Sequence, residues 1–589
     1  MNKQDVNGAG WRWGWLLGWA LFAAWMIIWK WNAIHWFALG DTDDNMRLMQ
    51  VRGLLDGQGW YDLRQYRLDP PQGYNIHWSR LVDLPIAGLI LASKPFFGVA
   101  IAEKIAVTVA PLLALGVALY GLMLTARRLI HPNSWPLAGA ILACAQVTLL
   151  MFAPLRIDHH GWQLAFLTLT IAGSADRDRL RGGLTTGLAT ALSLVIGLEM
   201  LPYLALAGAM TVLAWVRDEG AAARLKGYGL SLAAGCALGY AGFTSYDNSL
   251  AVCDVLSPVY LSTMLAAGAL AVVLSMIPAG NRRLRLSMAI IAGLVLATGF
   301  ILAWPQCLGR PEHISPELER LWFQFISEAK PMWSHGYKRY VPVFAIAVIG
   351  TAGGLAALWR NRHDERVMSW TTIAMLSLAS TGMLFWQTRA GAAAQMLAVP
   401  GATWLLWNGG SMTLASRNML VRVFGTFALF LFVSGLAISL GVQQIPEKPE
   451  TKARKQVSMA NRKCPTVPAL EPLDKLPPAT ILTFVDMGPR LITVTHHNAI
   501  AGPYHRNGAA ILDVQHSFRA ISPDVAHEVM KRHGATLLLL CPGMSESTLY
   551  STQDPKGFYN QLIKGKVPAW LTPIQLPKGS PFMLWRRVG

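Results

Sequence analysis

Apolar stretches recur along this chain from Trp13 to Leu440 and limit its fold more than any other feature. Each has roughly 18–23 residues, about the length that crosses the hydrocarbon core of a bilayer as one α-helix. The chain is 53% hydrophobic and only 14% charged, a composition too apolar for a soluble globular protein. The first stretch, 13–36, is rich in Trp and lacks an obvious small-residue cleavage site, so we expect a retained helix. The sequence therefore predicts a polytopic α-helical membrane protein.

The distribution of Lys and Arg predicts the topology. The stretch 84–100 contains Pro85, Lys94 and Pro95, and counting it as a span inverts the charge pattern downstream, so we interpret it as an interfacial or re-entrant helix. About thirteen spans then remain. Every loop on the face of the N-terminus is basic, which predicts that this face is cytoplasmic. The residues that carry this pattern are Arg127, Arg128, Arg177, Arg179, Arg181, Arg217, Arg224, Lys226, Arg282, Arg283, Arg285, Arg360, Arg362, Arg366, Arg417 and Arg422.

The opposite, exoplasmic face receives the long loops and the C-terminal part of the chain. The predicted transmembrane domain covers residues 1–443, with exoplasmic loops at 39–102, 155–161 and 307–339. A separate exoplasmic α/β domain is predicted for 444–589. Its strand-like stretches are 479–485, 490–495 and 535–541, and its helix-like stretch is 523–533. Cys464 and Cys541 lie in this domain, where exported cysteines can form a disulfide, although the sequence does not pair them.

The net charge of +18 could indicate a nucleic-acid-binding protein. Most of the basic residues, however, sit in short loops between apolar stretches, where they set topology and contact anionic lipids. We therefore expect membrane lipids as partners and no nucleic acid.

Acidic and histidine residues gather in three loops of the exoplasmic face. The first loop begins with Asp41, Asp43 and Asp44, which are suited to Mg²⁺ or Mn²⁺ and equally suited to capping the helix that follows. The second holds Asp158 and His160, a carboxylate and an imidazole that suit a divalent transition metal. The third offers Glu328, with Glu312, Glu317 and Glu319 nearby, and spacing alone does not choose among these four. Ionisable groups beside a bilayer are functional candidates, so the three loops together indicate one metal-centred site.

These loops are similar to those of the oligosaccharyltransferase catalytic subunits of the PglB and AglB type, within the GT-C glycosyltransferase superfamily. The first-loop motif DTDDNMR (41–47) resembles that family's DPWYHLR, which makes Asp41 the catalytic match, and GYNIHWSRLVD (73–83) resembles a second family stretch. The DHH motif of archaeal members is intact at 158–160. FISEAKP (325–331) is similar to the family's fifth-loop motif and selects Glu328. The resemblance implies a GT-C fold, with about thirteen transmembrane helices followed by an exoplasmic domain.

The same resemblance implies ligand roles. Asp41, Asp158, His160 and Glu328 would hold one Mn²⁺ or Mg²⁺ ion, and Asp41 and Glu328 would also act on the acceptor. Arg389, His77 and His159 would contact the donor phosphate. The family's acceptor-reading WWDYG appears here as FVDMG (484–488), which keeps only Asp486 and Gly488 and lacks both Trp residues. A nearby segment rich in His and Arg, THHNAIAGPYHRN (495–507), offers His505 and Arg506 either as acceptor-side or pyrophosphate residues or as parts of a polar loop.

The expected activity is metal-dependent transfer of a glycan from a polyprenyl-(pyro)phosphate donor to an acceptor, with inversion at the anomeric carbon. The acceptor class stays open between protein, lipid and polysaccharide. One alternative is a GT-C monosaccharide transferase that uses a polyprenyl-phosphate sugar to modify a lipid or polysaccharide. Another is a transporter or flippase, which would place its ionisable groups near the bilayer midplane and often shows paired repeats. We expect a multi-pass protein of the bacterial inner membrane, with a cytoplasmic N-terminus and a periplasmic C-terminal domain.

Overall fold

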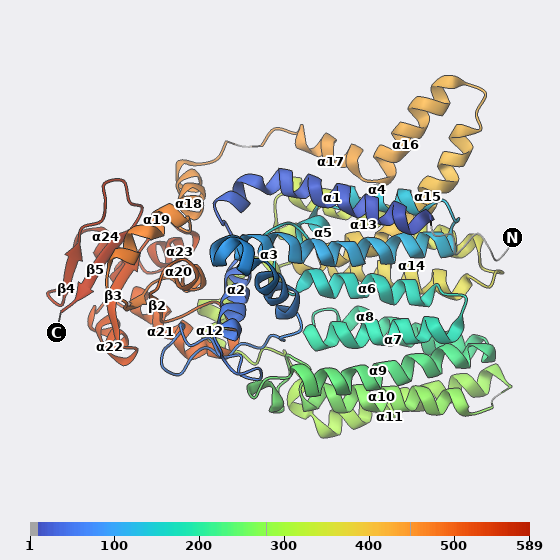
Figure 1. Ribbon diagram of the computed structural model, residues 1–589, viewed down its shortest axis with the longest axis horizontal. Coiled ribbons are helices and arrows are strands. Elements are labelled where there is room, and N and C mark those ends of the chain that lie inside the picture. The colour runs from blue at the N-terminus through green and yellow to red at the C-terminus, as the bar shows by residue number, and fades with distance from the viewer. Residues whose placement is uncertain (1–9, 279, 448, 589) are drawn as a thin grey trace.

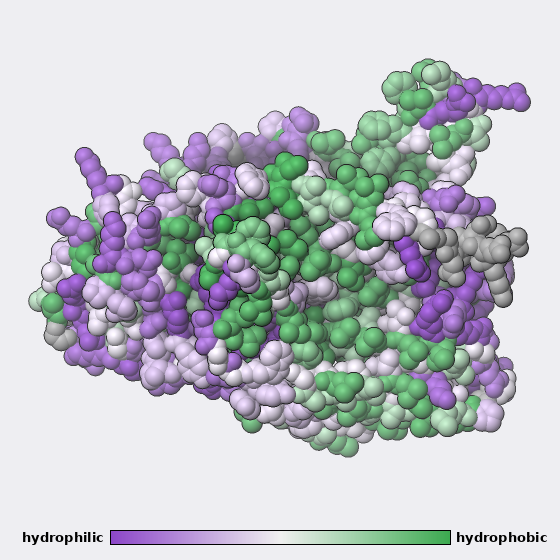
Figure 2. Space-filling model, viewed as in Figure 1, coloured by the Kyte–Doolittle hydropathy of each residue, from purple (hydrophilic) through white to green (hydrophobic). Residues whose placement is uncertain are grey.

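A bundle of helices and a smaller α/β domain make up the molecule (Figure 1). The computed structural model describes residues 10–278, 280–447 and 449–588, so the N-terminal end for which the sequence predicts a cytoplasmic location is outside the described residues. Figure 2 shows apolar residues spread over the middle of the bundle and hydrophilic residues at both of its ends. This distribution is the one expected for a membrane-embedded bundle.

The bundle helices run mostly side by side, and the C-terminal domain adjoins one end of them (Figure 1). In chain order they are α1 (Gly10–His35), α3 (Asp83–Leu129), α4 (Trp135–Cys144), α5 (Gln146–Leu150), α6 (His160–Ser174), α7 (Arg179–Ile196), α8 (Leu201–Arg217), α9 (Ala222–Phe243), α10 (Pro258–Met276), α11 (Arg282–Ala303), α13 (Tyr337–Arg360), α14 (Val367–Met383), α15 (Gly391–Leu414), α16 (Thr426–Val433) and α17 (Leu436–Gln443).

Within the described residues, five helices are long and apolar enough to cross a membrane: α1, α3, α10, α11 and α13. A sixth span is formed if the segments Val421–Val433 and Leu436–Gln443, which meet at 75°, are counted together. Gly435 lies between these two segments with φ 73°, in the left-handed region that glycine adopts without steric cost. The integral-membrane character is thus supported by length and composition, whereas the predicted number of about thirteen spans is not confirmed.

Helix α3 contains the stretch for which the sequence predicts an interfacial or re-entrant helix. It starts at Asp83, and its helical geometry is interrupted at Gly98, where φ is 75° and ψ is 169°. The segment before this break carries exposed Leu91, Phe96 and Phe97, and the segment after it is largely buried in the bundle. Two helices with different surroundings therefore meet at Gly98.

The C-terminal domain contains a five-stranded sheet in the order β2-β1-β3-β5-β4. Its strands are β1 (Thr480–Leu482), β2 (Asn498–Ala499), β3 (Ala535–Leu540), β4 (Leu571–Ile574) and β5 (Met583–Arg587). β1 pairs in parallel with β2 and β3, and β5 runs antiparallel to β3 and β4. The helices of this part are α18 (Lys452–Lys463), α19 (Val467–Leu470), α20 (Gly488–Val494), α21 (Gly508–Arg519), α22 (Asp524–Arg532), α23 (Ser545–Gln553) and α24 (Phe558–Ile563).

One of the strand predictions for this domain is wrong. The β-branched stretch 490–495 predicts a strand, but residues 488–494 form helix α20. Pro489 stands in the first turn, where its missing N–H costs no hydrogen bond. All residues from Gly488 to Thr493 are buried, so tertiary packing overrides the local β-propensity. The strands predicted near 479–485 and 535–541 and the helix near 523–533 are confirmed as β1, β3 and α22.

The segment between α1 and α3 shares one apolar core with the C-terminal domain, to which Met46, Tyr74 and Trp78 of that segment contribute. Polar contacts join the same two parts. Arg52 donates to the carbonyl oxygen of Thr493 over 2.7 Å, and Arg67 donates to that of Thr495 over 2.7 Å. The domain is therefore held directly over the loop that begins with Asp41.

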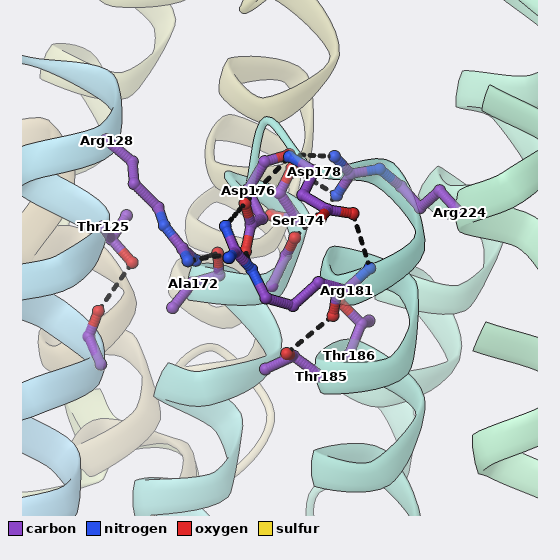
Figure 3. A network of polar contacts seen from close by, with 12 residues as sticks. Thr125, Arg128, Ala172, Ser174, Asp176, Asp178, Arg181, Thr185, Thr186 and Arg224 are labelled. Carbon is purple, nitrogen blue, oxygen red and sulfur yellow. Dashed lines mark hydrogen bonds and ion pairs between the residues drawn. The ribbon is translucent and has the colours of Figure 1, made fainter. Parts of the chain in front are cut away.

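At the opposite end of the bundle, several of the arginines used to predict topology also hold a turn together (Figure 3). Asp176, in the turn between α6 and α7, forms ion pairs with Arg128 at 2.6 Å and Arg181 at 2.8 Å. Arg224 of α9 donates to the carbonyl oxygens of Gly173 and Ser174, over 2.7 and 2.9 Å. These arginines thus cap the carboxyl end of α6 as well as marking one face of the bundle.

Two disulfides lie on the side of the C-terminal domain. Cys464 pairs with Cys541, the pair that the sequence left open. Cys253 pairs with Cys307 and joins the segment before α10 to the segment after α11. Cys144 and Cys236, which fall within the bundle, are free. The four paired cysteines are all at the end of the bundle that adjoins the C-terminal domain.

Replacement of Cys464 and Cys541 together by Ala should lower the unfolding free energy of the C-terminal domain by about 2–5 kcal/mol, because the disulfide restricts the unfolded chain. Chemical unfolding of purified protein in detergent, followed by protease resistance of the domain, measures this change. Wild-type protein in dithiothreitol should fall toward the same value, and Cys144→Ala should match wild type. Equal stability of the double variant and wild type would show that the disulfide does not stabilise the domain.

Candidate active site

The candidate site begins where α1 ends and α2 (Thr42–Leu55) starts. Asp41 is the N-cap of α2, with extended backbone, and its Oδ1 accepts from the Thr42 N–H over 2.6 Å. Asp41 therefore caps the N-terminus of α2, as the sequence allowed for this loop. It leaves Oδ2 of Asp41 for a second partner, so capping and a site role are compatible.

That second partner is Arg156, in the loop that precedes α6. Its Nη1 lies 2.6 Å from Asp41 Oδ2 and 3.4 Å from Asp44 Oδ2, and its Nη2 lies 2.6 Å from Asp158 Oδ2. Asp44 Oδ1 also accepts from the backbone N–H groups of Ile157 and Asp158, over 2.8 and 3.1 Å. The first and second acidic loops are thus joined around one guanidinium.

Burial and charge act in opposite directions on these carboxyls. Burial raises the pKa of Asp44 to about 8, although Arg156 lowers it. Burial and then the charges of Asp41 and Asp158 raise the pKa of Asp43. Burial also raises the pKa of Asp158, but Arg156 and the neighbouring imidazoles outweigh it and lower the value to about 2. Asp158 therefore stays charged while Asp44 holds a proton near neutral pH.

The DHH motif lies beside these carboxylates. The Asp158 Oδ1 accepts from the His160 N–H over 3.0 Å, at the start of α6. His159 Nε2 lies 2.9 Å from Glu199 Oε1, and Glu199 Oε2 accepts from Gln163 Nε2 over 2.6 Å. Burial lowers the pKa of His160, but the carboxylates of Asp158, Glu199 and Glu328 outweigh it and raise the value.

Glu328 and Arg389 belong to two short segments that contact each other. The backbone N–H of Thr388 donates to the carbonyl oxygen of Lys330 over 2.7 Å. Both Glu328 and Arg389 are exposed. The charge of Glu328 acts on Asp43 and His160, which places this third loop at the edge of the cluster without a direct contact to it.

His77 lies next to two of the acceptor-side candidates. Its ring centroid is 4.9 Å from that of His505. Asp254 Oδ2 lies 2.8 Å from His505 Nε2, and Arg506 donates to both oxygens of Asp254, over 2.6 and 2.8 Å. The segment rich in His and Arg therefore fastens the C-terminal domain to the segment before α10, next to His77. Whether it also binds acceptor or pyrophosphate stays a prediction.

The segment that corresponds to the acceptor motif is folded inward. Phe484 and Val485 are fully buried, and Glu546 accepts from the N–H groups of Val485 and Asp486, each over 3.0 Å. Desolvation and the charge of Asp41 raise the pKa of Asp486 to about 6, although Asp486 retains exposed surface, so this carboxyl faces the site. Gly488 has a packing role, because a Cβ there would lie 1.9 Å from the Ala501 carbonyl oxygen.

The chemistry of the cluster fits a divalent cation. Asp158 Oδ2 has only the ion-pair contact with Arg156 and no well-directed hydrogen bond, and His159 Nδ1 is buried without a partner. Among the described residues, two groups bring three ligand atoms within 4.8 Å of one another: His159 with His160 and Glu199, and His77 with Asp254 and His505. Asp41, Asp158, His160 and Glu328 do not form such a group together. Their shared metal role stays a prediction.

Comparison with solved structures identifies the fold. No protein-family model and no curated protein sequence matches the chain. The fold is that of an archaeal oligosaccharyltransferase. The AglB protein of Archaeoglobus fulgidus, in complex with an inhibitory peptide and a dolichol-phosphate, superposes with a TM-score of 0.64 at 14% identity, over 90% of this chain and 70% of that one.

Two further structures of the A. fulgidus enzyme agree. The form tethered to an acceptor peptide containing an NVT sequon gives a TM-score of 0.62 at 14% identity, over 98% of this chain and 74% of that one. The complex with Zn and sulfate gives a TM-score of 0.58 at 13% identity, over 89% of this chain and 67% of that one. The expected similarity in fold to an oligosaccharyltransferase is therefore confirmed.

Sequence reasoning missed three residues of this region. Arg156 carried a signal, since it is the one basic residue in an otherwise acidic exoplasmic loop. Glu199 and Asp254 stand alone in the sequence, between apolar stretches and far from the motifs. Their only signal was an isolated carboxylate next to a membrane span.

Replacement of Arg156 by Met should lower the unfolding free energy by about 3–5 kcal/mol at pH 7, because buried carboxylates lose their cation. The pKa of Asp158 is lowered in the folded protein, so its stabilising effect is present above the unfolded value and is lost as pH falls through the folded one. The deficit of the variant should therefore persist down to about pH 4 and shrink as the pH falls toward 2. Thermal unfolding in detergent measures it at each of these pH values.

Arg64→Met is the matched control, because Arg64 pairs with Asp247 at 2.9 Å in a more exposed place. Its cost should be only about 0–1 kcal/mol. Equal effects of the two substitutions would contradict the role given to Arg156.

Proposed function

We propose that this chain is a glycosyltransferase that moves a glycan from a polyprenyl-linked phosphate or pyrophosphate donor to an acceptor. The observation that carries the proposal is that Asp41 and Asp158 both pair with the Arg156 guanidinium. His160 lies beside this pair of carboxylates. This arrangement lies at the end of the bundle that adjoins the C-terminal domain. The fold is shared with an archaeal enzyme whose structures contain a dolichol-phosphate, an acceptor peptide, and Zn with sulfate.

Asp41, Asp158 and His160, with Glu328 at the edge, are the proposed residues of a divalent-metal site, for Mn²⁺ or Mg²⁺. When bound, such an ion stabilises the negative charge that develops on the leaving phosphate. Arg389 supplies a forked guanidinium for the same phosphate, and His77 lies on the donor side. Asp41 and Glu328 orient the acceptor and can remove its proton. Direct displacement of the phosphate by the acceptor inverts the anomeric carbon.

The proposed orientation places this end outside the cytoplasm. The arginines at the other end of the bundle favour a cytoplasmic location there. The two disulfides beside the site favour an oxidising compartment. In a bacterium this corresponds to an inner-membrane protein with a periplasmic C-terminal domain.

The structure of the FVDMG segment favours a second candidate. Phe484 and Val485 are buried in the domain core and offer no exposed aromatic pair to a peptide. A transferase that modifies a lipid or polysaccharide, with a monophosphate carrier, needs no such pair. Asp41, Asp158 and Arg389 would serve both reactions, so the acceptor and the carrier separate the two.

Transfer should depend on the ion and on the proposed residues. EDTA, or Asp158→Ala, should reduce transfer from a labelled lipid-pyrophosphate glycan by about 100-fold or more, since metal electrostatics contribute several kcal/mol to such reactions. Purified protein in detergent with a mixed acceptor pool and added Mn²⁺ gives this measurement. Glu317→Ala is the control, because Glu317 pairs with His516 on the surface. Full activity of both Asp41→Ala and Glu328→Ala would contradict the site.

Donor and acceptor preference should distinguish the two candidates. The burial of Phe484 and Val485 predicts little or no transfer to a peptide containing Asn-x-Ser/Thr, and transfer to a lipid or polysaccharide acceptor instead. Parallel assays with monophosphate and pyrophosphate carriers identify the leaving group. Efficient glycosylation of the peptide from a pyrophosphate donor would establish the oligosaccharyltransferase-like reaction and reject the second candidate.

A further inference from the structure

Glu199 lies in the turn between α7 and α8, and its carboxylate reaches the DHH motif. Glu199 Oε1 lies 2.9 Å from His159 Nε2, and Oε2 accepts from Gln163 Nε2 over 2.6 Å. The other end of the Gln163 amide, Oε1, lies 3.3 Å from His160 Nδ1. One carboxylate and one amide therefore contact both histidines of the motif.

The turn leaves room for this contact. Gly197 ends α7, and a Cβ on it would lie 2.4 Å from Glu199 Oε2 and 3.1 Å from Gln163 Nε2. Only a residue without a side chain lets these two groups meet in this place. The His159 side chain is 4% exposed and that of Glu199 is 20% exposed, so the pair is largely shielded from water.

Hydrogen-bond chemistry determines which nitrogens carry protons in the neutral histidines. A carboxylate can only accept, so His159 Nε2 must donate to Glu199, and the Gln163 group that faces Glu199 must be its NH₂. The oxygen of Gln163 then faces His160, whose Nδ1 must donate to it. The nitrogens left with a lone pair are His159 Nδ1, which is buried without a partner, and His160 Nε2.

We propose that Glu199 and Gln163 are positioning residues that present these two imidazole lone pairs to the divalent cation. Metal-binding histidines commonly donate their other N–H to a carboxylate or amide, which fixes the tautomer and the ring orientation. The two rings lie side by side, with centroids 4.3 Å apart, and they belong with Glu199 to one of the residue groups that could hold a metal ion. The inference rests on the proposed metal site and differs from the phosphate role that the resemblance implies for His159.

The oxygen ligands and the nitrogen ligands of the proposed metal site are held in place by different neighbouring residues. Asp41 and Asp158 supply carboxylate oxygens from the Arg156 side, and the two rings supply nitrogen from the Glu199 side. Mixed oxygen and nitrogen ligands suit Mn²⁺, Zn²⁺ or Co²⁺ better than an all-oxygen cation such as Mg²⁺. The ion expected here is therefore a transition metal.

Binding of Mn²⁺ alone tests the inference without any transfer reaction. Purified full-length protein in detergent is titrated with Mn²⁺, and the free ion is measured by electron paramagnetic resonance. Glu199→Gln and Gln163→Met should each raise the Kd about 10–100-fold, the usual effect of removing a residue that orients a metal ligand. His160→Ala serves as the reference for loss of a ligand, and wild type should prefer Mn²⁺ over Mg²⁺ in competition.

Glu317→Gln is the matched control, since Glu317 makes a 2.9 Å contact with His516 on the protein surface, and it should leave the Kd unchanged. Thermal unfolding without metal shows whether each variant is folded, and two different variants guard against a folding defect in one of them. Wild-type affinity in both folded variants would overturn the inference. A raised donor KM with unchanged Mn²⁺ affinity would overturn it in favour of a phosphate role for His159. Absence of Mn²⁺ binding by wild type would reject the proposed metal site itself.

Discussion

The site depends on one buried arrangement of charge, the Arg156 guanidinium between Asp41, Asp44 and Asp158. Asp41 and Asp158 come from two loops more than a hundred residues apart, and their negative charges would repel one another without a cation. Arg156 therefore determines how α2 and the start of α6 approach each other. The position of His160 follows, because the Asp158 carboxylate caps the first turn of its helix.

The protonation of Asp44 reduces the charge that this arrangement has to hold. With its pKa raised to about 8 by burial, Asp44 is neutral at pH 7 and acts mainly as a hydrogen-bonding partner of the second loop. Asp158, whose pKa is lowered to about 2, keeps its charge. The two acids thus differ in role although they are equally buried: Asp44 joins the loops, and Asp158 remains available as an anionic ligand.

Local patterns predicted the parts of the structure that local chemistry determines. Apolar stretches identified the bundle, and the DHH and DTDDNMR motifs located Asp158, His160 and Asp41 at one end of it. Residues whose role depends on tertiary contacts were not predictable in this way. Glu199 reaches His159 only because α6, α7 and the turn at Gly197 pack together, and residues 488–494 form a helix in which Gly488 to Thr493 are all buried. The number of about thirteen spans that hydropathy predicts is not confirmed by helix length and composition in the described residues.

The donor side and the acceptor side of the site are built differently, and this limits what the shared fold implies. The proposed donor side consists of loops that are fixed by buried ion pairs, such as the pair between Arg156 and Asp158. The acceptor side consists of surface groups of the C-terminal domain, such as Asp486, and of Tyr504, which donates to the Thr42 carbonyl oxygen over 3.2 Å. Phe484 and Val485 are buried and therefore do not contribute to this surface. The proposals for both donor and acceptor must therefore be argued from the residues of this chain, because the shared fold does not identify either one.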